Sequence, residues 1–373
     1  MTKYKFTCNS GEGFFDCKNR SIQLDGETLS LNVKSKIPNR RLYFIFSKAC
    51  NLRCVYCFQR DNLKAPCKFN PNNIISTLLT SIHDFDELVL YGGEPLLDSN
   101  LDIIQRVLSC RTGLPIYIFT NGNISLEAQE MIVSNKSQIR TIIITLDGTK
   151  SIHDTLRVNP NGSSFDNAIS TIDFLSQNSV FVQIQINVDS RNLKDVHRLI
   201  DYLDSRYASL SLHIVLNPIK YSPYTLRQEQ LLQLYFSIKK RCPNIDIQAN
   251  SRLLRNLLLL ICGNALESER CGLSRTVVAD FSGGILYACP HNEESVIGHI
   301  SDKLVYEHSE IANLLDRTQY KSETCTTCEY SYLCSYGCPF EEYDFITCKQ
   351  SMDHSLKVVF DNFDTLFSIE KRT

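Results

Sequence analysis

From residue 41 onward, short runs of β-branched and aromatic residues alternate with longer segments in which apolar residues recur every three or four positions. The short runs predict strands at 42–46, 88–91, 116–120, 142–146, 181–188 and 210–216. The longer segments predict helices, for example at 73–82, 103–108, 165–175 and 196–203. Six strand-helix units predict an α/β fold with a parallel sheet, a partial (β/α)6 TIM barrel.

Polar or glycine-rich residues follow the predicted strands. A cysteine-rich loop follows the first, and the next four are followed by Gly92-Gly93-Glu94-Pro95, Asn121-Gly122, Asp147-Gly148 and Asp189-Ser190. Functional residues of parallel α/β barrels lie at the carboxyl ends of the strands, so we expect these loops to line the same open end of the barrel. Paired glycines let a backbone approach a ligand closely, and Glu94 could bind an ammonium group; the alternative is a plain turn.

The regions on either side of the barrel differ in pattern. Strand-like pieces at 2–7 and 21–24 predict either a hairpin that closes the base of the barrel, which we favour, or an edge that pairs with an extended leader peptide. The expected domains are a β-rich extension (1–40), the partial barrel (41–225), a helical linker (226–262) and a cysteine-rich domain (263–373).

Composition and charge exclude several classes of protein. With 43% hydrophobic and 21% charged residues the chain is globular, and its net charge of -2 is too close to zero for a nucleic-acid partner. No apolar run reaches the ~20 residues that span a bilayer, and residues 1–20 have no apolar core of a secretory signal. We therefore expect a cytoplasmic protein without a membrane or nucleic-acid partner.

Sixteen cysteines are many for a protein of a reducing compartment and indicate metal binding. The first group is Cys50-Asn-Leu-Arg-Cys54-Val-Tyr-Cys57. Three thiolates in eight residues can hold three corners of a 4Fe-4S cluster and leave the fourth iron open to a small molecule. A structural zinc site is the alternative, but it needs four ligands, and only Cys67 is near.

The second group has more cysteines and lies near the carboxyl end. Its members are Cys271, Cys289, Cys325, Cys328, Cys334, Cys338 and Cys348, and Cys262 precedes them by nine positions. Two closed clusters need about eight thiolates, so Cys262 brings the count to that number. A pair of zinc knuckles is the alternative for this region alone. The remaining cysteines match no motif.

With the cysteine loop, Tyr91-Gly-Gly-Glu-Pro95, Thr120-Asn-Gly122 and Thr145-Leu-Asp-Gly148 in this order, the chain resembles the radical S-adenosylmethionine (SAM) superfamily. The carboxyl-terminal spacing, C-x12-G-x4-C, then C-x2-C-x5-C-x3-C and a last cysteine, looks like the SPASM domain of peptide- and protein-modifying members. Together the two resemblances cover about residues 41–350.

The resemblance implies a role for each motif. Cys50, Cys54 and Cys57 would hold the 4Fe-4S cluster that binds SAM. Residues expected to contact or surround SAM are Tyr56, Gly92, Gly93, Glu94, Asn121, Arg157 for its carboxylate and Asn187 for its ribose. One auxiliary 4Fe-4S cluster would use Cys271, Cys289 and Cys338, with Cys262 as a fourth ligand or an open iron, and the other would use Cys325, Cys328, Cys334 and Cys348. His291, two positions after Cys289, could accept a proton.

The implied chemistry is reductive cleavage of SAM to a 5'-deoxyadenosyl radical that takes a hydrogen atom from a substrate. We expect a maturase that forms a carbon-carbon, ether or thioether crosslink in a ribosomally made precursor peptide, supplied with electrons by a flavodoxin or ferredoxin. The alternative is an anaerobic sulfatase-maturase-like enzyme that makes formylglycine from Cys or Ser. In that group an Asp follows the second cysteine of the carboxyl-terminal domain, whereas Pro290 follows Cys289 here. An iron-sulfur redox protein without enzymatic activity is the alternative from another class.

Overall fold

The structure is a computed structural model. It describes residues 3–8, 11–24, 26–31, 35–36, 39–60, 67–208, 212–220, 222–262, 266–267, 275–311, 325, 327–334 and 345–370. Its contacts group the chain into two compact units. The barrel unit consists of Asn39–Val215 and Gly272–Leu315, and the terminal unit of Met1–Pro38, Leu216–Cys271 and Asp316–Thr373.

The barrel unit contains the predicted parallel strands. They are β6 (Arg41–Ile45), β8 (Glu87–Tyr91), β9 (Ile116–Thr120), β10 (Ile139–Thr145) and β12 (Val182–Val188). Their order in the sheet is their order in the chain, and every neighbouring pair is parallel. The sixth predicted strand, β13 (His213–Pro218), begins in this unit and ends in the terminal unit. The α/β class and the partial barrel are thus confirmed.

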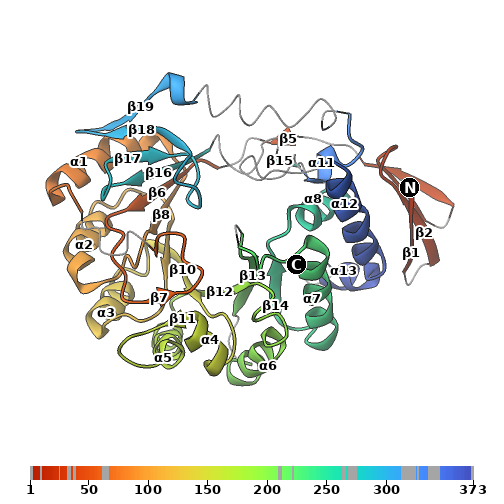
Figure 1. Cartoon of the computed structure of the whole chain (residues 1–373), viewed down its shortest axis with the longest axis horizontal. Helices are drawn as coiled ribbons and strands as arrows, with labels where there is room; N and C mark the ends of the chain where they lie inside the picture. Colours follow the sequence, from red (N-terminus) through yellow and green to blue (C-terminus); the bar gives the residue numbers. More distant parts are fainter. Residues whose placement is uncertain are drawn as a thin grey trace. The chain divides into compact units, whose positions relative to one another are not determined.

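Helices of this unit lie outside the curved row of strands (Figure 1). They are α1 (Pro71–Ser81), α2 (Leu101–Ser109), α3 (Leu126–Ser134), α4 (Lys150–Leu156), α5 (Ser164–Gln177) and α6 (Val196–Arg206), with short 3-10 turns η2 (Ile82–Asp84) and η3 (Asp98–Asn100). Side chains of Asn70, Ser125 and Ser163 cap the amino ends of α1, α3 and α5 by accepting a backbone N–H. Buried apolar residues at three- and four-residue spacing, as in α2, cover the outer face of the sheet.

The strands are apolar because most of their side chains are covered on both faces. Ile142, Ile143 and Ile144 in β10 are all buried. In β12 the buried side chains alternate with half-buried ones that face the interior of the barrel, among them Gln185 and Asn187. The interior at the strand ends therefore carries the polar groups.

Four further strands extend the sheet past β6. β16 (Thr276–Asp280) pairs with β6 in parallel, and β17 (Ile285–Tyr287), β18 (Val296–Ile300) and β19 (Leu304–Tyr306) follow as antiparallel neighbours. Part of the expected cysteine-rich domain (263–373) thus packs with the barrel strands. The two compact units are defined by contacts in the structure, whereas the expected domains were defined by sequence motifs. The predicted domain boundaries at residues 40, 225 and 262 are therefore not tested by the units and stay a prediction.

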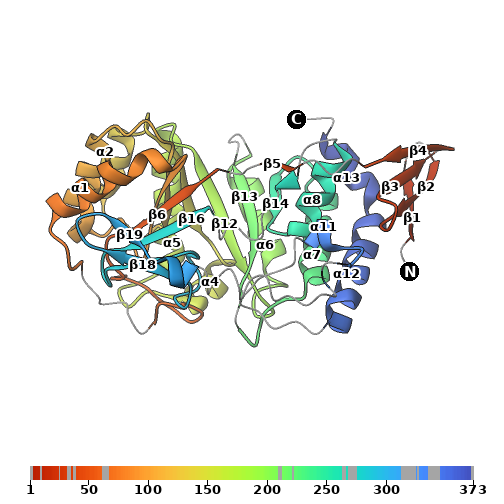
Figure 2. The same cartoon turned by 90° about the horizontal axis from the view of Figure 1, so that it is seen from above.

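The terminal unit contains a four-stranded antiparallel sheet that the sequence only partly predicted. Its strands are β1 (Lys3–Cys8), β2 (Gly11–Asp16), β3 (Ser21–Leu24) and β4 (Glu27–Ser30), in that order. Phe6 and Phe15 on its inner face stack against Phe360 and Phe363 of α12 (Phe345–Phe360) and α13 (Phe363–Glu370), with ring centroids 4.0 to 5.6 Å apart. Figure 2 shows these two helices beside the sheet. The predicted hairpin is therefore wrong in strand number, and the apolar face of the four-stranded sheet packs on carboxyl-terminal helices.

The rest of this unit is mainly helical. It includes β5 (Ser35–Lys36), which pairs with β15 (Leu266–Glu267), and also α7 (Gln228–Arg241), β14 (Asp246–Ala249), α8 (Arg252–Ile261) and α11 (Ser331–Cys334). No helix in the described part of the chain is long and apolar enough to cross a membrane.

Candidate active site

The cysteine loop and the Gly-Gly loop are in direct contact at the end of the first two strands. The backbone N–H groups of Gly93 and Glu94 donate to the carbonyl oxygens of Ser47 and Ala49, at 3.4 and 2.8 Å. A Cβ atom on Gly93 would lie 2.1 Å from the Ala49 oxygen. Gly92 has a φ of +138°, which disfavours other residues. The paired glycines are therefore required by the close approach of two backbones.

Glu94 is fully buried beside these glycines. Its carboxylate accepts hydrogen bonds from the Leu96 N–H, the Thr120 hydroxyl and the Asn121 N–H, at 3.0, 2.9 and 2.7 Å. Burial raises the pKa of Glu94 to about 7 although these bonds act in the opposite direction. The positive charge of an ammonium group would stabilise the ionised form of this buried carboxylate. The site therefore fits the predicted contact between Glu94 and the SAM amino group, which stays a prediction.

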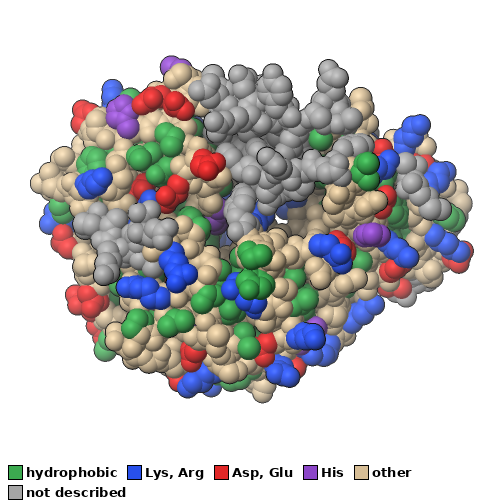
Figure 3. Space-filling view, in the orientation of Figure 1, with side chains coloured by type: hydrophobic (Ala, Val, Ile, Leu, Met, Phe, Trp, Pro, Cys, Tyr) green, Lys and Arg blue, Asp and Glu red, His purple; other side chains and the backbone are tan. Residues whose placement is uncertain are grey.

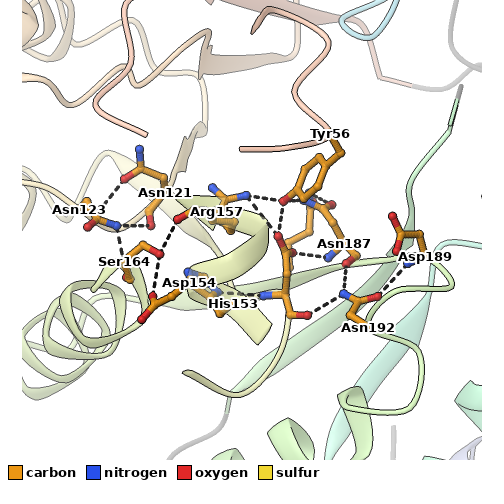
Figure 4. Close-up of polar contacts among 12 residues, drawn as sticks. Tyr56, Asn121, Asn123, His153, Asp154, Arg157, Ser164, Asn187, Asp189 and Asn192 are labelled. Atoms are coloured by element: carbon orange, nitrogen blue, oxygen red, sulfur yellow. Dashed lines mark hydrogen bonds and ion pairs between the residues drawn. The ribbon is translucent and has the colours of Figure 1, made fainter. Parts of the chain in front are cut away.

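Tyr56 is a half-buried member of a polar network inside the barrel, in which Asp147 and Arg157 are buried (Figure 4). Its hydroxyl accepts hydrogen bonds from Arg157 Nη1 and Asn187 Nδ2, at 2.7 and 3.3 Å, and donates to the Asp147 carboxylate. Arg157 also lies 3.6 Å from that carboxylate as an ion pair. The structure thus brings together three residues that the sequence analysis assigned separately to SAM.

Asp147 is the residue of this network to which the sequence analysis gave no role. It is fully buried, and its second carboxylate oxygen accepts the Asn187 N–H at 3.0 Å. Burial raises its pKa, against the opposing effect of the Arg157 charge. Asn192 Nδ2 donates to the Asp147 carbonyl at 2.6 Å, and the His153 ring accepts the Asp147 N–H at 3.1 Å. Its position directly after the fourth strand was the signal that could have identified it.

His153 should make the stability of the protein fall in mild acid. Burial, with the Arg157 charge, lowers its pKa to about 3, below the 6.5 of an unfolded chain. The unfolded state therefore binds the extra proton, and stability present above pH 6.5 is lost as the pH falls towards 3. Between about pH 7.5 and about pH 5 we expect this histidine to remove about 2 kcal/mol from the free energy of unfolding.

The measurement is anaerobic urea unfolding at the two pH values for the wild type and His153→Gln, whose amide oxygen can accept the same N–H. His153→Gln should lose most of the pH-dependent difference. The exposed His83 provides the control, His83→Gln, which should keep it. Equal pH dependence in the wild type and His153→Gln would contradict this role.

The three loop cysteines are partly buried, and no disulfide links cysteines in the described part of the chain. Burial raises the pKa of the Cys50 thiol to about 12 and also raises that of Cys54, which the Arg157 charge partly offsets. Asn121 Nδ2 donates to the Cys50 sulfur at 3.7 Å and to Asn51 Oδ1 at 2.8 Å, which places Asn121 at this loop. Binding to iron would deprotonate such thiols, and nearby N–H and guanidinium groups would stabilise the thiolates.

Ligation of a cluster by these thiols stays a prediction. Among the residues that the structure describes, no group of three or more His, Cys, Asp or Glu side chains is close enough together to hold a metal ion. The donors nevertheless fit the group, because three reduced cysteines share one short loop beside a buried arginine.

The carboxyl-terminal cysteines fall in both units. Cys289 follows β17 in the barrel unit, where its N–H donates to the Ser295 hydroxyl at 3.1 Å. Cys262, Cys325, Cys328, Cys334 and Cys348 belong to the terminal unit. Cys262 is exposed at the end of α8, and the Cys328 N–H donates to the Cys325 carbonyl oxygen at 3.4 Å. Cys271 and Cys338 lie outside the described residues.

His291 is an exposed residue of the turn after Cys289. Its ring lies edge-on to Tyr91 and Phe58, with centroids 6.3 and 6.0 Å apart. Tyr91 directly precedes Gly92, and Phe58 directly follows Cys57, so the structure places this imidazole beside both loops of the candidate site.

Lys48, two positions before Cys50, joins this turn to the barrel. Its Nζ lies 3.0 Å from Asp280 Oδ2 at the end of β16 and 2.7 Å from Glu293 Oε1 in the turn that carries His291. Lys48 and Asp280 are buried. Lys48 follows the predicted strand 42–46 with only Ser47 between them, and no motif in the sequence marked it.

Lys48→Met should destabilise the protein by about 3 kcal/mol, because it leaves the buried Asp280 carboxylate without its cation. Anaerobic urea unfolding of the full chain measures this cost. The exposed ion pair of Lys150 with Asp166 provides a matched control, and Lys150→Met should leave the unfolding midpoint almost unchanged. Equal effects of the two substitutions would contradict the role of Lys48.

Comparison with known proteins identifies the class. Residues 44–203 match the model of the radical SAM superfamily. The cysteine-type anaerobic sulfatase-maturating enzyme of Clostridium novyi is 26% identical over 327 residues, which cover 78% of this chain and 85% of that protein. The Bacillus subtilis subtilosin biosynthesis protein AlbA is 28% identical over 160 residues, 41% of this chain and 34% of that protein.

Solved structures support the same fold. The structure described as native anSMEcpe with bound AdoMet and Kp18Cys peptide has a TM-score of 0.68 at 18% identity and covers 90% of this chain and 100% of that one. Streptococcus suis SuiB bound to precursor peptide SuiA has a TM-score of 0.58 at 16% identity, with 80% and 72% covered. Residues 44–203 therefore form a radical SAM domain, the domain of enzymes that use SAM and 4Fe-4S clusters, and the chain has the fold of these solved structures.

Proposed function

We propose that this enzyme forms an intrapeptide crosslink in a ribosomally made precursor peptide. The observation that supports a crosslink most directly is the turn after Cys289, where Pro290 and His291 stand in place of the Asp of the sulfatase-maturase group. The imidazole lies against Tyr91 and Phe58, beside the loops of the candidate SAM site. A neutral imidazole in this position can take the proton that the second side chain loses when the new bond forms.

The chemistry has three parts. When bound, SAM and its cluster supply a 5'-deoxyadenosyl radical that removes one hydrogen atom from a substrate C–H bond. Auxiliary clusters held by the carboxyl-terminal cysteines would accept the electron, and a base of this chain would accept the proton, that the substrate releases when two side chains join with a net loss of two hydrogen atoms. The network of Tyr56, Asp147 and Arg157 would hold SAM in place inside the barrel and keep water out.

We also propose the ligands of the auxiliary clusters. One cluster is assigned to Cys271, Cys289 and Cys338, with Cys262 as a candidate fourth ligand, and the other to Cys325, Cys328, Cys334 and Cys348. Lys349 pairs with Glu329 at 2.9 Å, and these two residues directly follow Cys348 and Cys328 in the chain.

Formation of formylglycine is the second candidate function. It is supported by the anaerobic sulfatase-maturating enzymes of Clostridium novyi and Klebsiella pneumoniae, which match 78% and 83% of this chain. In that case His291 would take the place of the missing Asp.

One experiment separates the two candidates. A small peptide encoded beside the gene is co-expressed with the enzyme without oxygen, and its mass and its reaction with a hydrazide probe are compared with those of the peptide expressed alone. A crosslink predicts the loss of two hydrogen atoms without reaction with the probe. A product that reacts with hydrazide, or a cysteine that has lost its sulfur, would refute crosslinking in favour of formylglycine.

A further inference from the structure

Part of the cysteine loop belongs to a short two-stranded ribbon. β7 (Arg53–Cys54) pairs antiparallel with β11 (Arg157–Val158), so that Cys54 faces Arg157 and Arg53 faces Val158. Side chains alternate across a ribbon. Arg157 is buried on the inner face with Cys54, whereas Arg53 and Val158 on the outer face are exposed. The outer face is thus one strand layer away from a predicted cluster ligand.

The outer face combines apolar and basic side chains. Val55 and Val158 are each 40% exposed, which is high for large apolar residues. Arg53 is exposed, and its Nη1 donates to the carbonyl oxygens of Cys50 and Leu52, both at 2.8 Å. Basic and hydrophobic side chains gather in Figure 3 over the place where Figure 1 draws β7.

A second arginine extends the positive charge along the cysteine loop. Arg60 is exposed, and its backbone N–H donates to the Cys57 carbonyl oxygen at 3.3 Å. The ribbon and the loop end therefore present cations close to two of the three predicted ligands. Such a surface attracts a partner with an acidic face, and its apolar centre can exclude water from the contact.

We propose that the outer face of the β7 and β11 ribbon, formed by Arg53 and Val158, together with the adjoining exposed loop residues Val55 and Arg60, docks a small acidic one-electron carrier protein. This inference rests on the proposed function, because radical formation from SAM consumes one electron per cleavage. The reduced carrier would lose that electron to the cluster, which would pass it to SAM; the bond between the SAM sulfur and the 5' carbon would then break to give methionine and the 5'-deoxyadenosyl radical. Electron transfer requires a close approach, and this face is the thin cover over Cys54. A small, transient contact of this kind suits a carrier that must leave after each transfer.

The test uses the full-length, cluster-loaded enzyme without any peptide. Its reduction is followed optically with reduced flavodoxin as the acidic carrier, and separately with dithionite. The variants Val158→Glu and Arg60→Glu should slow reduction by flavodoxin at least tenfold while reduction by dithionite changes less than twofold. Higher salt should also slow the reduction of the wild type by flavodoxin, towards the rate of the variants. It should not slow the reduction by dithionite.

Matched controls lie at the opposite ends of the strands. Phe181 is 51% exposed just before β12, and Arg140 is exposed near the start of β10. Phe181→Glu and Arg140→Glu should leave both rates unchanged. Because the readout is cluster reduction, a failed search for a crosslinked peptide would not affect this result.

Three outcomes would overturn the proposal. The first is an unchanged flavodoxin rate in both ribbon variants, and the second is equal slowing with dithionite, which would indicate damage to the cluster loop. The third is a change of oligomeric state on Val158→Glu, which would assign the face to a second copy of the chain.

Discussion

Cys54→Ala is expected to reduce SAM cleavage to background. Cys54 lies on the inner face of the β7 and β11 ribbon beside Arg157, and it is one of only three thiols in the loop. Without it, two thiolates cannot hold the open cluster to which SAM binds. The measurement is 5'-deoxyadenosine formed by the reconstituted, dithionite-reduced protein. Cys110→Ala is the matched control, because Cys110 lies at the end of α2 and matches no motif, and it should retain full cleavage.

The companion variant Cys328→Ala should retain part of the SAM cleavage yet give no crosslinked product. Cys328 belongs to the terminal unit, whereas the cysteine loop belongs to the barrel unit. Its loss should remove an auxiliary cluster that accepts the substrate electron. If Cys328→Ala lost both activities to the same extent while its circular dichroism stayed native, the separate roles of the two cysteine groups would be refuted.

Gly93→Ala is expected to lower the rate of SAM cleavage by about 100-fold. The added Cβ would lie 2.1 Å from the Ala49 oxygen and 2.3 Å from the Lys48 oxygen. Both are backbone atoms directly before Cys50, so the two loops must move apart instead of a side chain turning away. A displacement of about 1 Å in the residues that hold a reactant is enough for such a loss.

Gly113→Ala is the control for this variant. Gly113 has a φ of +79°, and no atom lies within 4 Å of its added Cβ, so alanine there adds backbone strain without moving the site. It should cleave SAM at the wild-type rate. Equal rates for Gly93→Ala and the wild type would show that the contact between the two loops is not needed to hold SAM.

The barrel could be predicted from the sequence because its signals are local. Strands such as 116–120 are short β-branched runs, and the structure has β9 at the same residues. Their order in the sheet follows from right-handed strand-helix units. The expected position of Gly92, Gly93 and Glu94 beside the cysteine loop followed from the same rule, since carboxyl ends of parallel strands share one edge.

The residues that the sequence analysis missed are defined by contacts between distant segments. Asp147 matters because Tyr56, 91 positions earlier, donates to it. Lys48 is held by a carboxylate 245 positions later. The amino-terminal sheet was underestimated because its partners, Phe360 and Phe363, lie at the other end of the chain. Periodicity predicts an element and its buried face, but it does not predict which other element covers that face.

The most direct test of the account is the fate of SAM on the anaerobically reconstituted, reduced enzyme. We expect 5'-deoxyadenosine and methionine in equal amounts from the wild type and neither from Cys54→Ala. Unchanged SAM in the presence of the wild type, with iron and sulfide confirmed at the level of full cluster loading, would contradict the assignment of this site to radical chemistry.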